Sequence, residues 1–285
     1  MVQLAQTKIK EFDPLSQHFL ENPWSELRRM RESCRAYRHE GTATPVISFF
    51  HDEDIRAMQK DWQTWSSQRS VKSNKKGLGA GAVMIGMDPP EHTIYRKVVA
   101  PIFMPKRISA LQPTIDQHTS DILDEAIDAG EVDFMEEVAS KLATSIICKI
   151  CGFPQEDRAF IRKWTIESSR DYGKGSFYTE ANPEHEARVA EVHANVGPYI
   201  VEHIKTLRKS KTPSILLDVA DQVDDDRIMV GLCTLMLGAG NDTASILMTN
   251  GLWELMQKPD QTHWLRQNPD KINQAVEEFL RCRGS

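Results

Sequence analysis

The stretch Leu235–Met248, LMLGAGNDTASILM, combines two patterns that rarely occur together. Both of its flanks are typical of a buried helix, but its middle contains two glycines followed by Asn241, Asp242 and Thr243. Each glycine costs a helix roughly 1 kcal/mol relative to alanine, and the three polar side chains compete with the backbone for hydrogen bonds. A buried aspartate without a partner costs more still. Local rules that are broken at one point indicate a functional site.

Helical spacing gives this stretch a nearly bare face. Ala239 and Thr243 lie one turn apart on it, with Gly240 beside them, so a flat and rigid group could approach the backbone closely. Thr243 offers a hydroxyl at the edge of that face, and Asp242 could relay protons from a partly dry site. The alternative is a helix kink at which another helix packs against the glycines. The residues alone leave both interpretations open.

Helical periodicity dominates the rest of the chain, and short strands are expected only at residues 34–37 and 45–50. From residue 88 onward we predict helices over 89–100, 105–129, 134–150, 155–170, 184–210, 225–257, 259–267 and 270–282. We therefore predict a single domain over residues 1–285, mainly α-helical, with a small β-sheet near the N-terminus.

A long loop is predicted over residues 67–87, and loops of that length usually carry function. Its segment Gly77–Ala82, GLGAGA, matches a dinucleotide-binding fingerprint, but that motif must follow a strand and open a helix. Neither context is expected here. We interpret the glycines as a flexible segment that opens and closes over a site.

The segment DPPEHTIYRKVVAP begins with a strong helix-start signal. Asp88 is expected to be the N-cap, Pro89 the first helical residue and Glu91 the capping-box acid. His92 and Arg96 then lie four residues apart on one face, where an anion with two carboxylates would be favourable. On spacing alone, a solvated polar face is the simpler interpretation.

Bulk composition excludes several classes of protein. The 285 residues are 40% hydrophobic and 27% charged, with a net charge of −6, so nucleic acid is not an expected partner. No signal peptide or membrane span is evident, and we expect a cytoplasmic protein without a membrane partner. The five cysteines do not suit a disulfide framework. Cys148 and Cys151 form a C-x-x-C, but no second pair completes a zinc site, and a buried helix that ends at Gly152 explains them better.

Three motifs in order make the chain resemble the soluble bacterial cytochrome P450 haem-thiolate monooxygenases over nearly its whole length. Residues 88–108 resemble the family's haem-propionate helix, with His92 and Arg96 in its H-x-x-x-R positions. AGNDT at 239–243 matches the [AG]-G-x-[DE]-T motif of the long helix over the haem. NQAVEEFLR at 273–281 matches the E-x-x-R helix, through Glu278 and Arg281.

This resemblance implies a haem b cofactor, a small apolar substrate, one O₂ and a ferredoxin-type electron donor. Thr243 would hydrogen-bond oxygen on the distal side of the haem, and Asp242 would help to deliver the protons that cleave the O–O bond. Glu278 and Arg281 would form a structural ion pair. The haem would contact His92, Arg96, Ala239, Gly240 and Phe103, and the substrate pocket would be lined by Val83, Met84, Leu235 and Gly238.

The family's axial cysteine stands in a glycine-containing loop well after the E-x-x-R helix, and none of the five cysteines has that context. We therefore expect no metal ligand in this chain, an incomplete P450 fold that is C-terminally truncated, and no activity of the chain alone. Without a thiolate there is no strong push for O–O cleavage. The alternative is a non-catalytic helical binding protein derived from the family, which keeps the pocket without the haem. A plain helical interaction domain would require the three motifs to be coincidental.

Overall fold

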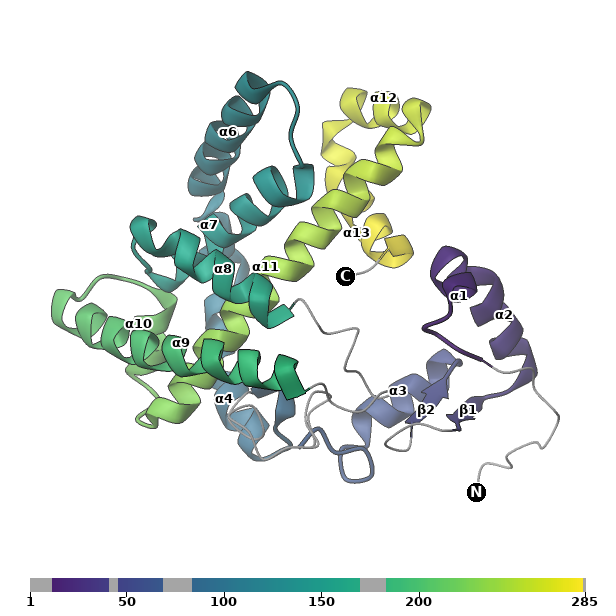
Figure 1. The fold of residues 1–285 in the computed structure, drawn as a ribbon, viewed down its shortest axis with the longest axis horizontal. Coiled ribbons are helices and arrows are strands. Elements are labelled where there is room, and N and C mark those ends of the chain that lie inside the picture. Colours follow the sequence, from purple (N-terminus) through teal and green to yellow (C-terminus); the bar gives the residue numbers. More distant parts are fainter. Residues whose placement is uncertain (1–11, 41–45, 69–83, 170–182, 284–285) are drawn as a thin grey trace.

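The computed structural model describes residues 12–40, 46–68, 84–169 and 183–283. Within them the chain is mainly α-helical with one small two-stranded sheet near the N-terminus, so the predicted fold class is confirmed (Figure 1). The elements up to the middle of the chain are α1 (Gln17–Glu21), α2 (Pro23–Ser33), β1 (Ala36–His39), β2 (Val46–Phe49), α3 (Asp52–Lys60), η1 (Met84–Gly86), α4 (Glu91–Val99), η2 (Ala100–Phe103), α5 (Pro105–Ser109) and α6 (Gln112–Ala129). The remaining elements are η3 (Phe134–Ala139), α7 (Ser140–Cys151), η4 (Gln155–Asp157), α8 (Arg158–Ser169), α9 (Pro183–Ser210), α10 (Ile215–Ala220), α11 (Asp226–Met256), α12 (Pro259–Gln267), η5 (Pro269–Lys271) and α13 (Ile272–Arg283).

The N-terminal elements, α1 to α3 with the sheet, lie to one side of the helical body (Figure 1). β1 and β2 are antiparallel, with Ala36 opposite Phe49 and His39 opposite Val46. The buried ring of Phe12 packs edge-on against neighbouring aromatic side chains and holds α1 against the sheet. β1 begins two residues later than predicted because Cys34, at the end of α2, still donates its backbone N–H to the helix.

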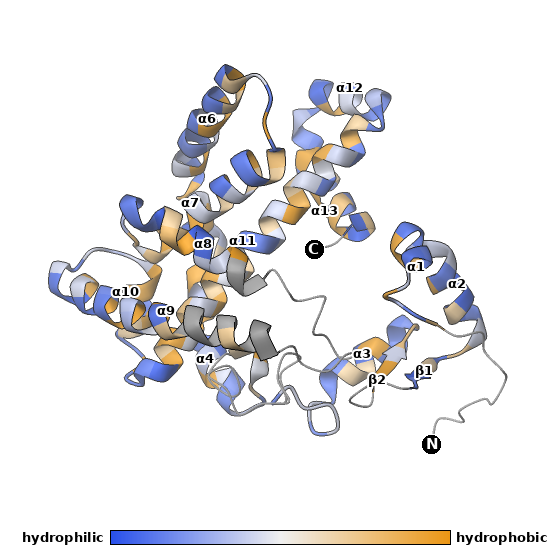
Figure 2. Cartoon of the chain, viewed as in Figure 1, coloured by the Kyte–Doolittle hydropathy of each residue, from blue (hydrophilic) through white to orange (hydrophobic). Residues whose placement is uncertain are grey.

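α11 is the central element of the helical body, and it contacts α7, α8, α9, α10, α12 and α13 (Figure 1). It begins at Asp226 because the Asp225 side chain caps the first turn, accepting from Arg227 N at 2.8 Å and Ile228 N at 3.3 Å. Its hydrophobic N-terminal half packs against the apolar faces of α7, α9 and α10 (Figure 2). Fully buried members of this core include Ile200, Leu216, Val219, Leu232 and Leu237.

α7 ends as predicted for the C-x-x-C segment. Gly152 follows the last turn in the left-handed conformation with φ of 80°, and a Cβ there would lie 2.6 Å from Cβ of Ser214. Both the backbone conformation and the close approach of Ser214 therefore require glycine. Cys148 and Cys151 are free, fully buried thiols of the core.

The predicted helix start at Asp88 is wrong. α4 begins at Glu91 with Pro90 in the cap position, and no side chain caps it. Asp88 is buried, and its carboxylate accepts hydrogen bonds from Ser67 N at 2.8 Å and from the Ser66 hydroxyl. The acid therefore ties Ser66 and Ser67 to the segment that leads into α4.

Smaller differences concern boundaries. The predicted helix over 105–129 is two helices, α5 and α6, and α1, α2 and α10 were not predicted. The predicted start at residue 134 is a π-helical turn that leads into α7. The loop motif Gly77–Ala82 lies outside the described residues, as does Val83. None of the described helices combines the length and apolar character needed to cross a bilayer.

Candidate functional site

The glycines at the centre of α11 do not interrupt it, because the helix is continuous from Asp226 to Met256. Hydroxyl groups along this part of the helix donate back to carbonyl oxygens one turn earlier. Thr243 Oγ1 donates to Ala239 O at 2.7 Å, and Ser245 Oγ donates to Asn241 O at 2.7 Å. The polar side chains thus find partners within the helix itself.

The bare face predicted for α11 is present and exposed. Ala239 and Thr243, one turn apart, are both exposed although they lie at the middle of the central helix. A Cβ added at Gly238 would meet no atom within 4 Å, so this glycine borders open space. A flat group could reach the α11 backbone here without displacing any described side chain.

Gly240 was expected on this bare face, and that expectation is corrected. A Cβ at Gly240 would lie 3.0 Å from Cδ1 of Ile147 on α7. The position therefore faces α7, and its glycine allows the two helices to approach closely. The predicted alternative, tight packing of a helix on the glycines, holds at Gly240 but without a break in α11.

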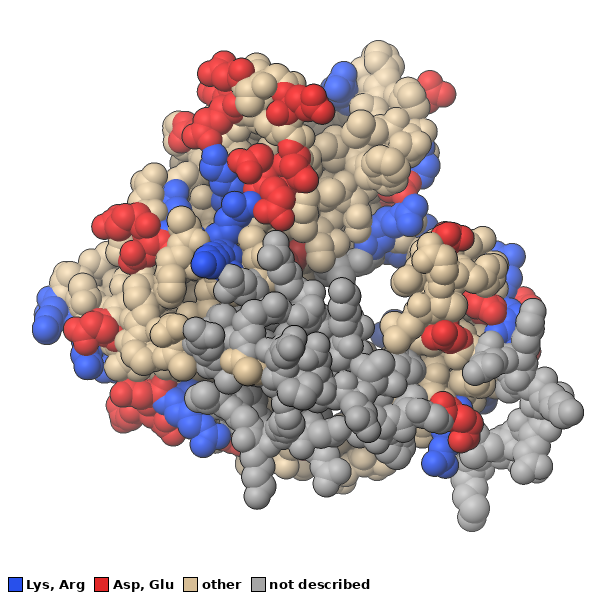
Figure 3. All heavy atoms as spheres, in the orientation of Figure 1, with Lys and Arg blue, Asp and Glu red and all other residues tan. Residues whose placement is uncertain are grey.

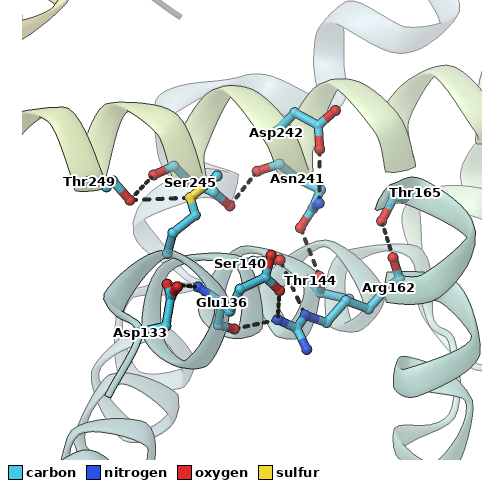
Figure 4. A network of polar contacts seen from close by, with 11 residues as sticks. Asp133, Glu136, Ser140, Thr144, Arg162, Thr165, Asn241, Asp242, Ser245 and Thr249 are labelled. Carbon is cyan, nitrogen blue, oxygen red and sulfur yellow. Dashed lines mark hydrogen bonds and ion pairs between the residues drawn. The ribbon is translucent and has the colours of Figure 1, made fainter. Parts of the chain in front are cut away.

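Asn241, the third residue of the motif, faces α7, and it is a polar side chain at a fully buried point of α11 (Figure 4). It is 2% exposed. Its Oδ1 accepts from the buried Thr144 hydroxyl at 2.8 Å, and its Nδ2 donates to Oδ1 of Asp242 at 3.0 Å. Asp242 is itself partly exposed. The acid of the motif is therefore held by a side chain that is anchored in a second helix.

Neither Asn241 nor Thr144 was among the predicted site residues. The sequence does show a polar residue among apolar neighbours in each of the two helices. It does not show that these two residues bond to each other, because they are 97 positions apart.

Further polar contacts fasten the neighbouring turns (Figure 4). Arg162 on α8 pairs with the Glu136 carboxylate at 2.7 Å and donates to Ser140 Oγ at 3.3 Å. Thr249, two turns after Asn241, donates to Ser245 O at 2.9 Å and also contacts the Met135 sulfur. The Arg162 contacts therefore join α8 to η3 and α7, and the Thr249 contact joins α11 to η3.

α4 carries the two predicted cations. His92 is half-buried and Arg96 is exposed, and neither side chain forms a hydrogen bond or ion pair with a described residue. α4 packs against η1, and η1 contacts α11. η2 follows α4 directly and ends at Phe103, whose side chain is 50% exposed.

The predicted pocket residues have unequal environments. Met84 in η1 is buried in the core, Leu235 is partly buried against the same core, and Gly238 borders open space. Leu235 shares its face of α11 with Ala239 and Thr243. An apolar surface therefore continues along α11 from the bare face toward its N-terminus.

Glu278 and Arg281 on α13 form a two-bond ion pair, with both contacts at 2.7 Å. Hydrogen bonds from the guanidinium and from the Cys282 thiol, in that order, lower the pKa of Glu278 to about 2. Both side chains are well exposed, so solvent screens the pair. α13 itself is held against α11 at Gly251, where a Cβ would lie 2.8 Å from the Phe279 ring.

Burial disfavours the thiolate form of four of the five cysteines. Cys148, Cys151 and Cys233 are fully buried, and burial raises the thiol pKa of all three, that of Cys148 to about 12. Burial also raises the pKa of the half-buried Cys34. Within the described part of the chain, no group of three or more His, Cys, Asp or Glu side chains is arranged to hold a metal ion.

Comparison with known proteins gives consistent relatives, although no protein-family model matches the chain. The chain is 33% identical to the vitamin D(3) 25-hydroxylase of Pseudonocardia autotrophica, over 98% of this chain and 68% of that protein. It is 27% identical to the cytochrome P450 monooxygenase PikC of Streptomyces venezuelae, over 98% of this chain and 67% of that protein. The ligand-free structure of cytochrome P450 TbtJ1 superposes with a TM-score of 0.80 at 28% identity, covering 95% of this chain and 69% of that one.

Proposed function

This chain belongs to the cytochrome P450 family, and we propose that the exposed face of α11 around Ala239 and Thr243 is where its haem and its oxygen meet. Family members are haem-dependent monooxygenases, so the chain is by family a P450 monooxygenase. It spans about two thirds of the length of these relatives. The activity of the whole protein is accordingly part of this proposal.

The residues present fit a haem b group on three counts. The group is flat, and the surface at Ala239, Thr243 and Gly238 is bare and borders open space. It carries two carboxylates, and His92 with Arg96 offers two donors without described partners on one face of α4. The exposed aromatic ring of Phe103 lies at the end of the next turn. When bound, the haem supplies the activation of O₂ that allows one oxygen atom to enter an apolar substrate.

Three cysteines, Cys148, Cys151 and Cys233, are packed in the hydrophobic core, and the Cys282 thiol donates to Glu278 on α13. We therefore assign no iron ligand to a described residue. The proposed fit concerns the propionate and distal contacts only.

Thr243 and Asp242 have distinct proposed roles. The Thr243 proton is directed at Ala239 O, so the free lone pairs of Oγ1 accept a hydrogen bond from a proton-bearing oxygen on the exposed face. Asp242 is partly exposed, and Asn241 engages only one of its oxygens. Its other oxygen can take a proton from solvent and hand it toward Thr243.

The substrate proposed is a small apolar molecule, lying against Leu235 beside Gly238. A relative named for a hydroxylase of vitamin D(3) supports an apolar ligand class. The proposed electron donor is a ferredoxin-type protein, and we treat residues 1–285 as one domain. The family relationship gives no support to a non-catalytic binding protein.

The observation that carries the proposal is the bare face of α11 with one hydroxyl at its edge. The test fuses residues 1–285 to the C-terminal third of the vitamin D(3) 25-hydroxylase, which this chain does not span, and supplies haem, ferredoxin, its reductase, NADH and vitamin D3 as the first substrate probe. Thr243→Ala should lower the ratio of product formed to O₂ consumed and raise hydrogen peroxide release. Thr249→Ala is the matched control, because its hydroxyl also bonds back one turn but lies away from the bare face. An unchanged ratio in Thr243→Ala would overturn the assigned role.

A further inference from the structure

A concave surface lies between α6, α7, η4 and α8, none of which contributes a residue to the bare face of α11. It is an open hollow of about 330 Å³. Six polar side chains line it: Thr114, Gln117, His118, Lys149, Gln155 and Arg158. Among the described residues that line the hollow none is acidic, although the whole chain has a net charge of −6.

The two permanent cations of the hollow are not neutralised by the protein. Lys149 and Arg158 form no ion pair or side-chain hydrogen bond with a described residue. Arg158 also has its Nε buried without a hydrogen-bond partner. Other cations on the same two helices are paired, Lys141 with Glu125 and Arg162 with Glu136. Acidic and basic side chains of the described residues lie interspersed on the face drawn in Figure 3.

Two acids that are close in the chain to lining residues form hydrogen bonds with other side chains. Asp157, next to Arg158 in the chain, accepts a hydrogen bond from the Tyr199 hydroxyl at 2.6 Å. Asp121 accepts from the Gln117 amide at 2.7 Å. The positive charge of Arg158 therefore remains available to a ligand.

His118 reports the electrostatic potential of the hollow. Its pKa is lowered, first by burial and then by the charges of Arg158 and Lys149, while Asp121 opposes the shift. The imidazole thus lies in a field that favours negative charge. An anion bound in the hollow would raise the pKa of His118. The ring could then be protonated, so that both of its nitrogens act as hydrogen-bond donors.

We propose that this hollow binds the phosphate group of a small phosphate ester. A guanidinium, an ammonium, an imidazole, a hydroxyl and two amides supply many donors, and a tetrahedral oxyanion has enough acceptors to use them. Two cations in a lining without acidic side chains suit a doubly charged phosphate better than a single carboxylate. The hollow is also larger than a phosphate ion, which leaves space for the ester's organic part.

The test is a titration of the full chain followed by NMR of the His118 ring, assigned with a His118→Gln variant. Inorganic phosphate and glycerol 3-phosphate are added separately, against sodium chloride at equal ionic strength. Both phosphates should bind saturably and raise the pKa of His118. Tighter binding of glycerol 3-phosphate supports an ester ligand, and equal affinities would overturn the ester and leave a free phosphate site.

Lys149→Gln and Arg158→Gln should each weaken binding by about tenfold or more, because each removes a charge-assisted contact. Lys141→Gln is the matched control on the same helix, and it should leave the affinity unchanged because Lys141 is already paired. Lys149 is exposed, so its variant keeps the test valid if Arg158→Gln fails to fold. A response no larger than that to sodium chloride, or an equal loss in all three variants, would overturn the proposal.

Discussion

Replacing Thr144 by valine keeps the branched shape of the side chain and exchanges the hydroxyl that donates to Asn241 Oδ1 at 2.8 Å for a methyl group. Asn241 is 2% exposed and Thr144 is 2% exposed, so water cannot take the place of the lost donor. A buried amide oxygen left without a donor costs about 1–3 kcal/mol. The free energy of unfolding should fall by that amount. Thr144→Ser keeps the hydroxyl and loses one methyl, at a cost of about 1 kcal/mol.

The losses of stability expected for Thr144→Val and Thr144→Ser overlap, so these two variants alone do not isolate the hydrogen bond. A double-mutant cycle with Asn241→Leu isolates it. Removing both partners leaves no orphaned group, so Thr144→Val with Asn241→Leu should be less destabilising than the sum of the single changes. We expect a coupling energy of about 1–2 kcal/mol, within the range measured for contacting residues.

The assay is urea unfolding at 25 °C, followed by circular dichroism, with unchanged denaturant slopes as the check that only stability has moved. Single and double effects that add to within about 0.5 kcal/mol would refute the reasoning. Such a result would mean that Asn241 does not link α7 to Asp242, and that the motif acid is not held from the second helix.

Two further predictions concern the glycines of α11 and a buried histidine. The Cβ added by Gly238→Ala meets no atom within 4 Å, so this variant should stabilise the chain by up to about 1 kcal/mol. The Cβ added by Gly251→Ala lies 2.8 Å from the Phe279 ring, so that variant should destabilise the chain by about 1–3 kcal/mol. Equal effects of the two variants in denaturation curves would contradict this prediction. His203 stacks on Phe153, and its pKa is lowered mainly by burial, against a hydrogen bond to Gly152 and the charge of Asp157. The unfolded chain therefore takes up the proton first, so stability should be full above about pH 6.5 and fall below it, more steeply than in His203→Gln. Parallel stability curves for the two proteins between pH 7.5 and 5 would count against it.

The sequence predicted α12 to the residue and α11 to within one residue, and the reason is local. Each has its start signal at the point where the helix begins: Pro259 occupies the first position of α12, and Asp225 caps α11. At Asp88 the same kind of local signal failed, because Ser66 and Ser67 use its carboxylate instead. A side chain with the pattern of an N-cap can thus bond to a distant segment and leave the helix without a side-chain cap.

The bare face of α11 was predictable because small side chains one turn apart leave it bare in any helix. The direction from which a neighbouring helix approaches is not encoded in that pattern, which explains the misplaced Gly240. The bond from Thr144 to Asn241 joins residues 97 positions apart, and no local rule relates them. The hollow between α6, α7, η4 and α8 is likewise formed by residues that are distant in the sequence, so no local pattern predicts it.

The most direct test of the central claim is a haem titration of the 285-residue chain, followed by the Soret absorbance. The account predicts saturable binding that is weakened about tenfold or more by His92→Ala with Arg96→Ala, which removes two charge-assisted contacts. Ala239→Trp, which covers the bare face, should weaken it as well. The control replaces His263 and Arg266 on α12 by alanine and should leave the affinity unchanged. Failure of the unaltered chain to bind haem, or one common affinity for all four proteins, would contradict the claim that this face of α11 receives the haem.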